Sequence, residues 1–319
     1  MPKAQAASRS VPYVNFPAQF AEEHAEILAC VEAVFSRGEF IGGAEIDQLE
    51  AELAALCGSK HAVVLNSGTD ALILAMKVLG VEPGDEVITP PNSFIASAAS
   101  IALIGARPVF ADVKPDQNID PAAIEAAITP RTVAIMPVHL TGRMADMTAI
   151  RAIARRHGLL VIEDAAQAIC SRVDGMTAGS AGDVGCFSLH PLKNLNAAGD
   201  AGFITLNDDE QAARLKRLRN HGFINRETSL EFGYVSRLDT LQAAILRDQT
   251  AFNAATVGKT CTVLLDRPGR QPGQQVGKSP WLQSVHLNTD AAIGDLIEVE
   301  IVSAGPNSLG GVERVKAAA

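Results

Sequence analysis

The chain has few aromatic residues, few cysteines and no long apolar run. Phe, Trp and Tyr make up 4% of its 319 residues, so the core must consist mainly of Ala, Leu, Ile and Val. The five cysteines lie far apart and form no Cys-x-x-Cys pair, which disfavours a disulfide framework, a zinc site and an iron–sulfur cluster. No run of about 18 apolar residues and no apolar export signal is present. We therefore expect a cytoplasmic protein that is neither exported nor inserted into a membrane.

Basic residues are also fewer than acidic ones, with 27 Lys and Arg against 36 Asp and Glu. The formal net charge of −9 argues against a protein that binds nucleic acid over its whole surface, because such proteins are usually basic. Residues 251–319 hold six Lys and Arg against six Asp and Glu, so the region before them carries the whole excess of acid. Apolar residues are abundant at 47%, which is enough for the large core of a two-domain chain.

Short apolar runs alternate with helical segments between residues 61 and 162. We expect strands at 61–65, 86–88, 107–110, 133–137 and 159–162, and helices at 20–37, 44–56, 69–79, 94–104, 121–128 and 146–157. This alternation predicts an α/β fold with parallel β-α-β units and helices on both faces of the sheet. Further along, 184–188 and 202–206 are expected to form a hairpin-like strand pair, followed by helices at 208–218 and 238–249.

The last 70 residues or so have a different character. Strand-like runs at 260–265, 282–287 and 296–302 are separated by Pro-Gly, Ser-Pro and Gly-Pro-Asn turns. About 70 residues of this kind predict a small all-β barrel. We therefore expect two domains, a large one at 1–247 and the barrel at 248–319.

A lysine and an aspartate occupy distinctive positions in the large domain. Lys193 follows a predicted strand in a loop bordered by glycines, and Asp164 ends the apolar run 159–162, where open α/β sheets bind ligands. A lysine can form an imine with an aldehyde and carry protons, and an aspartate can keep a pyridine nitrogen protonated. The pair points to pyridoxal phosphate, with Lys193 and Asp164 as catalytic residues. The alternatives are an ordinary surface lysine and an aspartate that caps a helix or binds a metal.

Two further segments suit the phosphate and the ring of that cofactor. Ser67-Gly68-Thr69 follows strand 61–65 and opens a helix, where backbone N–H groups, hydroxyls and the helix dipole attract a phosphate. The alternative is a plain helix N-cap. Phe94 opens another helix and can form a wall against the ring, although such a residue is more often part of the core.

Residues 14–246 resemble the DegT/DnrJ/EryC1/StrS family of sugar aminotransferases. The matching segments include 38–43, Asn66-Ser67-Gly68-Thr69, 84–88, 137–140, Glu163-Asp164-Ala165-Ala166-Gln167-Ala168, the segment around Lys193, and Ser236-Arg237-Leu238-Asp239. The resemblance implies the large domain of a fold type I pyridoxal-phosphate-dependent transferase, with a mostly parallel seven-stranded sheet and a homodimeric assembly. It implies transfer of an amino group from an amino acid to a keto sugar, with glutamate as the expected donor and a nucleotide-linked sugar as the expected acceptor.

The resemblance also implies roles for individual residues. Lys193 would form the imine with the cofactor, and Asp164 would pair with its pyridine nitrogen. The remaining cofactor-binding residues would be Gln167 beside the ring, Phe94 stacked on it, and Ser188 with Ser67, Gly68 and Thr69 at the phosphate. Some relatives have histidine instead of the lysine and act as dehydratases, so Lys193 favours transamination.

The chain departs from the family pattern in two places. The family usually has an asparagine before Ser236 that reaches the phosphate of the partner subunit's cofactor. This chain has Val235 there, which cannot donate a hydrogen bond. The family also continues into a small domain that closes over the substrate, whereas this chain changes character after Ala251.

Residues 251–309 resemble the C-terminal TRAM domain of the radical-SAM methylthiotransferases that modify tRNA. The matching segments are 251–253, Val257-Gly258-Lys259, 273–279 and 304–309. The resemblance implies weak, salt-sensitive RNA binding through Lys259, Arg267, Arg270 and Lys278, and the alternative is a solvated barrel face. The junction near 246–249 is either a genuine fusion or a chimera of two genes, and we favour the chimera because each half lacks part of the family pattern that it resembles. An inactive large domain with an RNA-binding barrel, or a chain without function, remain the alternatives to an active aminotransferase.

Overall fold

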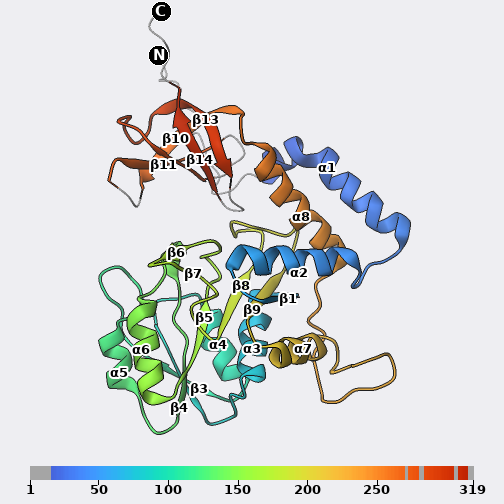
Figure 1. Ribbon diagram of the computed structural model, residues 1–319, viewed down its shortest axis with the longest axis vertical. Coiled ribbons are helices and arrows are strands. Elements are labelled where there is room, and N and C mark those ends of the chain that lie inside the picture. Colours follow the sequence, from blue (N-terminus) through green and yellow to red (C-terminus); the bar gives the residue numbers. More distant parts are fainter. Residues whose placement is uncertain (1–15, 270–271, 280–283, 305–307, 315–319) are drawn as a thin grey trace, which may run out of the picture.

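The computed structural model describes residues 16–269, 272–279, 284–304 and 308–314 of the chain. It consists of an α/β region and a smaller barrel, which is drawn above that region in Figure 1. The α/β region contains every residue predicted to bind the cofactor, so its sheet determines the geometry of the candidate site.

A seven-stranded sheet, in the order β1-β9-β8-β5-β4-β2-β3, forms the centre of the α/β region. Its strands are β1 (His61–Leu65), β2 (Glu86–Thr89), β3 (Arg107–Phe110), β4 (Thr132–Ile135), β5 (Leu160–Asp164), β8 (Val184–Ser188) and β9 (Gly202–Leu206). The neighbours from β8 to β3 are parallel, and β9 runs antiparallel to both β1 and β8. The mostly parallel seven-stranded sheet expected from the sequence is therefore confirmed, as is the β8–β9 pair.

Helices cover both faces of this sheet, except the first, which packs along the last. They are α1 (Phe16–Arg37), α2 (Ala44–Cys57), α3 (Gly68–Val78), α4 (Ile95–Leu103), α5 (Pro121–Ala127), α6 (Met147–His157), α7 (Asp209–Leu218) and α8 (Thr240–Ala255), with a 3-10 turn η1 (Leu140–Gly142). One buried cluster joins α2, α5, α6 and α8 to one face, and a second joins α3, α4 and α7 to the other. Among the helices of the described residues, none is both long and apolar enough to cross a membrane.

Alternation of side chains along the strands explains the two clusters. In β1, Val64 belongs to one cluster and its neighbour Val63 to the other, and Val161 and Ile162 in β5 divide in the same way. Successive side chains of a strand point to opposite faces. Continuous apolar runs in the sequence therefore become strands that are buried on both sides, as parallel sheets require.

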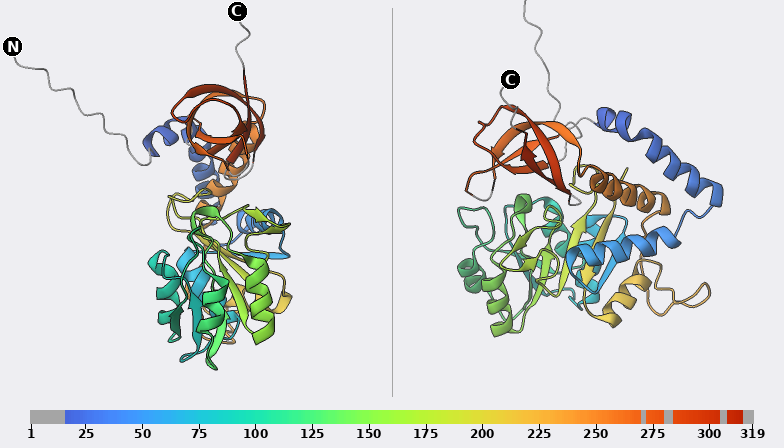
Figure 2. Two further views of the ribbon diagram at one scale, coloured as in Figure 1. Left: turned by 90° about the vertical axis from the view of Figure 1, so that its left-hand side faces the viewer. Right: turned by 45° about the horizontal axis from the view of Figure 1, so that its top comes forward.

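The C-terminal part is a closed barrel in the strand order β10-β11-β12-β14-β13. Its strands are β10 (Thr260–Pro268), β11 (Gln274–Lys278), β12 (Ser284–Asn288), β13 (Leu296–Ala304) and β14 (Ser308–Glu313). Figure 2 shows it as a ring of strands, and its buried side chains form a core of their own. The predicted barrel is confirmed. The sequence did not indicate β11 and β14 as strands, because their glycines weaken the strand pattern. A Cβ at Gly277 or Gly311 would collide with Val263 or Val299, respectively, so these positions need glycine.

One helix connects the two parts. α8 runs through the boundary predicted between residues 247 and 248, and β10 begins only at Thr260. The buried side chains of Ala243 and Leu246 fix the first half of α8 to the α/β region. α1 packs along α8, and the two helices lie side by side in Figures 1 and 2.

Candidate functional site

The sheet gathers most of the predicted site residues at the carboxyl ends of its strands. Asp164 is the last residue of β5 and Ser188 is the last residue of β8. These two strands pair in parallel, with Asp164 opposite Cys186, so their ends meet at one edge of the sheet. Lys193 follows in the loop after β8, and α3 and α4 begin at the ends of β1 and β2. This edge is the place where open α/β sheets bind ligands.

The Asp164 carboxylate is buried and accepts hydrogen bonds from two donors. Its side chain is 5% exposed. The Ser97 hydroxyl donates to Oδ2 at 2.6 Å, and the Ala166 backbone N–H donates to Oδ1 at 3.3 Å. Burial raises the pKa of Asp164, while the hydrogen bond from Ser97, the bond from Ala166 and the nearby His139 and Lys193 oppose that rise. The site therefore holds a carboxyl group whose charge depends on its immediate partners.

Lys193 lies half-buried in a loop that is fixed by backbone hydrogen bonds. Its N–H donates to the His190 carbonyl at 2.8 Å. On either side, the N–H of Leu189 donates to the Ala201 carbonyl and that of Ala197 donates to the Leu189 carbonyl, both at 2.8 Å. Burial lowers the pKa of Lys193, and the charge of Asp164 opposes this. A lowered pKa increases the neutral fraction of an amine, which is the form that attacks a carbonyl.

The start of α3 lies against the end of β8. A Cβ placed on Gly68 would be 2.7 Å from the Ser188 Cβ, so only glycine permits this approach. The Ser67 hydroxyl caps α3 by accepting from the Asp70 N–H at 3.0 Å. This contact uses an oxygen lone pair and leaves the hydroxyl proton as a donor, so capping is compatible with the predicted contact to a phosphate. Thr69 is the second residue of the helix. The first N–H groups of a helix lack intrahelical acceptors and can bind a phosphate.

Phe94 and Gln167 are both exposed. Phe94 precedes α4 and is 73% exposed, so it is not part of the core. It is one turn before Ser97, whose N–H donates to the Phe94 carbonyl at 3.3 Å. Gln167 follows β5, and its Oε1 accepts from the Thr141 N–H at 2.8 Å, which joins it to η1. A flat ring would find an aromatic wall at Phe94.

The sequence did not identify a buried pair beneath the site. His139 and Glu163 are fully buried, with Nε2 and Oε2 2.8 Å apart. The His139 Nδ1 accepts from the Ala145 N–H at 3.2 Å, so Nε2 carries the proton and donates to Glu163. Three backbone N–H groups, of residues 179, 181 and 182, also donate to the Glu163 carboxylate. The pair fixes the loops on both sides of Asp164.

Ser97 was also missed. It lies within an Ala/Ser-rich helix where its residue type is unremarkable, and the sequence offers only its place three residues after Phe94 as a signal. Its contact with Asp164 joins positions 67 residues apart. Only the folded sheet brings them together.

Val235 lies at the surface close to the phosphate segment. It is 57% exposed. The next residue, Ser236, donates from its hydroxyl to the Asn66 Oδ1 at 3.0 Å, which places Val235 beside the start of α3. The preceding loop exposes further large apolar side chains, namely Ile224, Leu230, Phe232 and Tyr234.

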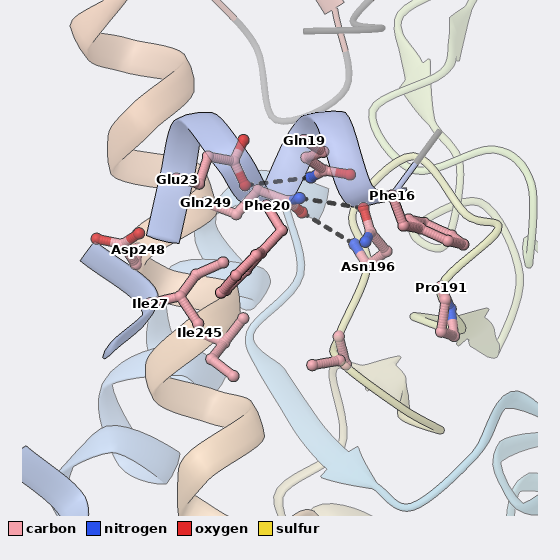
Figure 3. A pocket seen from close by; sticks show the side chains of 12 residues that line it. Phe16, Gln19, Phe20, Glu23, Ile27, Pro191, Asn196, Ile245, Asp248 and Gln249 are labelled. Atoms are coloured by element: carbon pink, nitrogen blue, oxygen red, sulfur yellow. Dashed lines mark hydrogen bonds between the residues drawn. The ribbon is translucent and has the colours of Figure 1, made fainter. Parts of the chain in front are cut away.

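A separate pocket lies between α1, α8 and the loop that carries Lys193 (Figure 3). Its volume is about 340 Å³, and its walls come from α1, α8 and the loop residues 191 and 196–198. None of the predicted site residues lines it. At its edge the Gln249 amide donates to the Asn196 Oδ1, and the Asn196 N–H donates back to the Gln249 Oε1, both at 3.0 Å. α8 is therefore hydrogen-bonded to the loop that carries Lys193.

Together these residues fit pyridoxal phosphate. A buried carboxylate with acceptor positions to spare suits the ring nitrogen, and a half-buried lysine with a lowered pKa suits the aldehyde. The close approach at Gly68 and Ser188 suits the phosphate, and the exposed Phe94 suits the ring face.

The chain matches the model of the DegT/DnrJ/EryC1/StrS aminotransferase family over residues 21–254. It is 49% identical over 247 residues to "UDP-N-acetyl-3-dehydro-alpha-D-glucosamine 3-aminotranferase" of Acidithiobacillus ferrooxidans, covering 77% of this chain and 67% of that protein. It is 48% identical over 238 residues to "Pleiotropic regulatory protein" of Geobacillus stearothermophilus, covering 74% and 64%. The chain thus spans about two thirds of the length of these relatives.

Solved structures of similar proteins agree with this match. S. venezuelae DesV, in complex with a ketimine intermediate, has a TM-score of 0.73 and 38% identity, covering 85% of this chain and 78% of that one. NtdA from Bacillus subtilis, with bound cofactor PMP, has a TM-score of 0.71 and 35% identity, covering 80% and 61%.

Proposed function

Since the chain belongs to the DegT/DnrJ/EryC1/StrS aminotransferase family, we propose that it is a pyridoxal-phosphate-dependent sugar aminotransferase. It transfers an amino group from an amino acid, with glutamate as the expected donor, to the keto group of a nucleotide-linked sugar. The observation that carries this proposal is the placement of half-buried Lys193 and buried Asp164 at one sheet edge. Relatives named as aminotransferases of UDP-linked and dTDP-linked sugars support the substrate class.

The residues divide the work between binding and proton transfer. Asp164 binds the ring nitrogen and keeps its proton there, which lets the bound cofactor act as an electron sink. When the cofactor is bound, the Lys193 amine would bond to its aldehyde carbon with loss of water. Once the amino donor had displaced it, the amine would carry a proton from the donor's α-carbon to that carbon of the cofactor. In the second half-reaction Lys193 would carry a proton from the same carbon to the sugar carbon. The overall reaction follows ping-pong kinetics.

The other residues would hold and orient the cofactor. Gly68 and Thr69, at the start of α3, donate backbone N–H groups to the phosphate, and the Ser188 hydroxyl adds a further contact. Phe94, which is exposed, would pack on one face of the bound ring, and Gln167, held by Thr141, would lie beside it. Both contacts exclude water from the reacting atoms.

Covalent labelling tests the cofactor part of this proposal. Purified protein incubated with pyridoxal phosphate should gain an absorbance band in the visible region. Borohydride reduction should then attach the cofactor to the peptide that contains Lys193. Lys193→Ala should lose both signals, whereas Lys60→Ala, a surface control paired with Asp209, should keep them. A visible band that survives Lys193→Ala would refute the assignment of the lysine.

We also propose that the protein forms a homodimer. The apolar side chains around Val235, including the fully exposed Phe232, support this, because exposed apolar patches commonly mark interfaces. Light scattering coupled to gel filtration measures the mass directly. Phe232→Ser should weaken the dimer, and a monomeric parent protein at high concentration would contradict the proposal.

A second candidate function, for the barrel, is weak RNA binding. Arg267 on β10 and Lys278 on β11 lie on paired strands. They are close enough that Arg267 contributes to lowering the pKa of Lys278, after the larger effect of burial. Two neighbouring cations can contact a phosphate backbone. Arg267 also contacts its neighbour Asp266 at 2.9 Å, and Arg270, another predicted contact, lies outside the described residues.

Salt dependence tests the RNA proposal. Labelled tRNA titrated at low and moderate salt should bind more weakly as salt rises, and Arg267→Ala should reduce both the affinity and the salt slope. Arg314→Ala, at a cation paired with Glu300, is the control. Binding that does not respond to salt would rule out this function.

The division into two parts and the compartment remain proposals as well. The family match ends at residue 254 and the barrel begins at Thr260, which supports separate origins for the region 1–247 and the region 248–319. The five cysteines are all free, which supports a reducing compartment such as the cytoplasm.

A further inference from the structure

A chain of two hydroxyl groups leads from Ser93, just before α4, through Ser97 to the carboxylate of Asp164. Ser97, in the first turn of α4, is 1% exposed. Its Oγ lies 2.6 Å from the Asp164 Oδ2 and 2.7 Å from the Ser93 Oγ. The single hydroxyl proton of Ser97 goes to the carboxylate, so Ser93 must donate in the second contact. A hydroxyl that accepts one hydrogen bond becomes a stronger donor for the next.

Among the groups around Asp164, Ser97 lowers the pKa of its carboxyl the most. His139, before η1, and Lys193, after β8, lower the pKa of Asp164. Glu163, its neighbour in β5, is bound to His139, and Cys186 lies opposite on β8. Burial pushes the carboxyl toward its neutral form, and the Ser97 hydrogen bond is the largest effect in the other direction.

We propose that Ser97 is a positioning residue for the cofactor's ring nitrogen, acting through Asp164. This inference rests on the proposed function. The Ser97 hydroxyl keeps Asp164 ionised and holds Oδ2, so that the carboxylate presents a fixed acceptor to the ring N–H. The same helical turn carries Phe94, because the Ser97 N–H bonds to the Phe94 carbonyl. One turn of α4 thus places both the acceptor for the ring nitrogen and the wall against the ring.

Binding of an analogue without the aldehyde isolates this contribution. In full-length Lys193→Ala protein, 4-deoxypyridoxine 5′-phosphate binds without any covalent bond, and calorimetry measures its affinity between pH 5 and 9. Adding Ser97→Ala should weaken binding by about 10- to 100-fold at neutral pH, the range expected for a hydrogen bond to a charged group. It should also move the acidic limb of the affinity profile upward by about 1–2 pH units. Ser97→Thr keeps the hydroxyl and should retain most of the affinity.

A matched control separates this role from a structural one. Ser100→Ala removes a buried hydroxyl from the same helix, one that bonds only the Ser97 carbonyl among the described contacts, and it should leave affinity unchanged. The benzene analogue, which has the same phosphate but no ring nitrogen, should bind Ser97→Ala and its parent equally. An equal loss for both analogues would show that Ser97 merely supports the fold, and would overturn the inference.

The remaining outcomes distinguish the two proposals. If the parent binds the pyridine analogue and Ser97→Ala binds it equally well with an unchanged pH profile, the inference about Ser97 fails while cofactor binding stands. If the parent binds neither analogue, the proposed function fails and the inference fails with it.

Discussion

Asp164 combines its proposed role in binding the cofactor with a cost in stability at neutral pH. Burial raises its pKa in the folded protein above the value in the unfolded chain. Over the pH range between those two values, the folded state holds a proton that the unfolded state has released. Stability contributed by the neutral carboxyl is therefore present at low pH and is lost as the pH rises through the folded pKa.

Asp164→Asn should separate these two effects. The amide carries no charge, so the cofactor-free variant should melt at a higher temperature than the parent at neutral pH. Its melting temperature should also fall less as the pH is raised. Cofactor affinity should drop by about 10- to 100-fold, because the ring N–H loses a charged partner. Thermal melts from pH 4 to 8 test this, and parallel pH profiles for the two proteins would contradict it.

Gly68 is the residue at which the site allows least change. Gly68→Ala would put a Cβ 2.7 Å from the Ser188 Cβ, which forces α3 and β8 apart at the proposed phosphate position. We expect a loss of about 1–3 kcal/mol in unfolding free energy and much weaker binding of pyridoxal phosphate. Urea denaturation and absorbance titration measure the two effects.

A compensating change provides the control for Gly68. Ser188→Gly in the Gly68→Ala protein removes the clashing Cβ and should restore part of the lost stability. Thr69→Ala, which adds no atoms, should leave stability near that of the parent. A Gly68→Ala protein with unchanged stability and affinity would show that the segment is looser than the structure indicates.

At the scale of elements, Glu50 of α2 connects three parts of the fold. Its carboxylate is contacted by Arg219 at 2.6 Å and by Lys216 at 2.7 Å, and its Oε1 accepts from the Val64 N–H at 3.1 Å. Arg219 also donates to the Val64 carbonyl at 2.7 Å. A single acid therefore joins α2, β1 and the end of α7.

Glu50→Gln should destabilise the protein by about 2–3 kcal/mol, because it leaves Arg219 poorly paired in a mostly buried place. Lys216 is about half exposed, so its share of this loss is small. Glu52→Gln on the same helix breaks a more exposed pair with Arg247 and should cost at most about 1 kcal/mol. Urea unfolding followed by circular dichroism compares them, and equal losses would contradict this account.

Helices and strands could be predicted from the sequence where the residue pattern that specifies them is local. Apolar runs such as 61–65 and 159–162 gave the parallel strands, and capping acids such as Asp208, which accepts from the Gln211 N–H, explain where helices begin. Lys193 and Asp164 could be proposed because each lies next to such an element. Ser97 and His139 could not, because their partners lie far away in the sequence. β11 and β14 were missed because their glycines are selected by tight packing inside the barrel.

At the scale of the whole molecule, the barrel has a core of its own. Leu265, Val285 and Ile301 belong to a cluster that shares no residue with the two clusters of the sheet. A chain with separate cores need not unfold in one step. We therefore expect the barrel to lose its structure independently of the cofactor site.

Leu265→Ala tests this independence. Leu265 is 1% exposed, so its truncation should destabilise the barrel by about 2–5 kcal/mol. The visible band of bound pyridoxal phosphate should not change. Leu264→Ala, at the exposed neighbouring position of β10, should have little effect on either property. Loss of the cofactor band in Leu265→Ala would show that the two parts unfold together.

From the two hydrogen bonds between Gln249 and Asn196 we expect a limit on where this protein tolerates recombination. A residue inserted into or deleted from α8 before Gln249 would turn that side chain by about 100° around the helix axis, away from the loop that carries Lys193. Changes after Gln249 leave this register intact. The chain therefore has a natural graft point about two turns from the end of α8. Beyond it another domain can replace the barrel without moving the lysine.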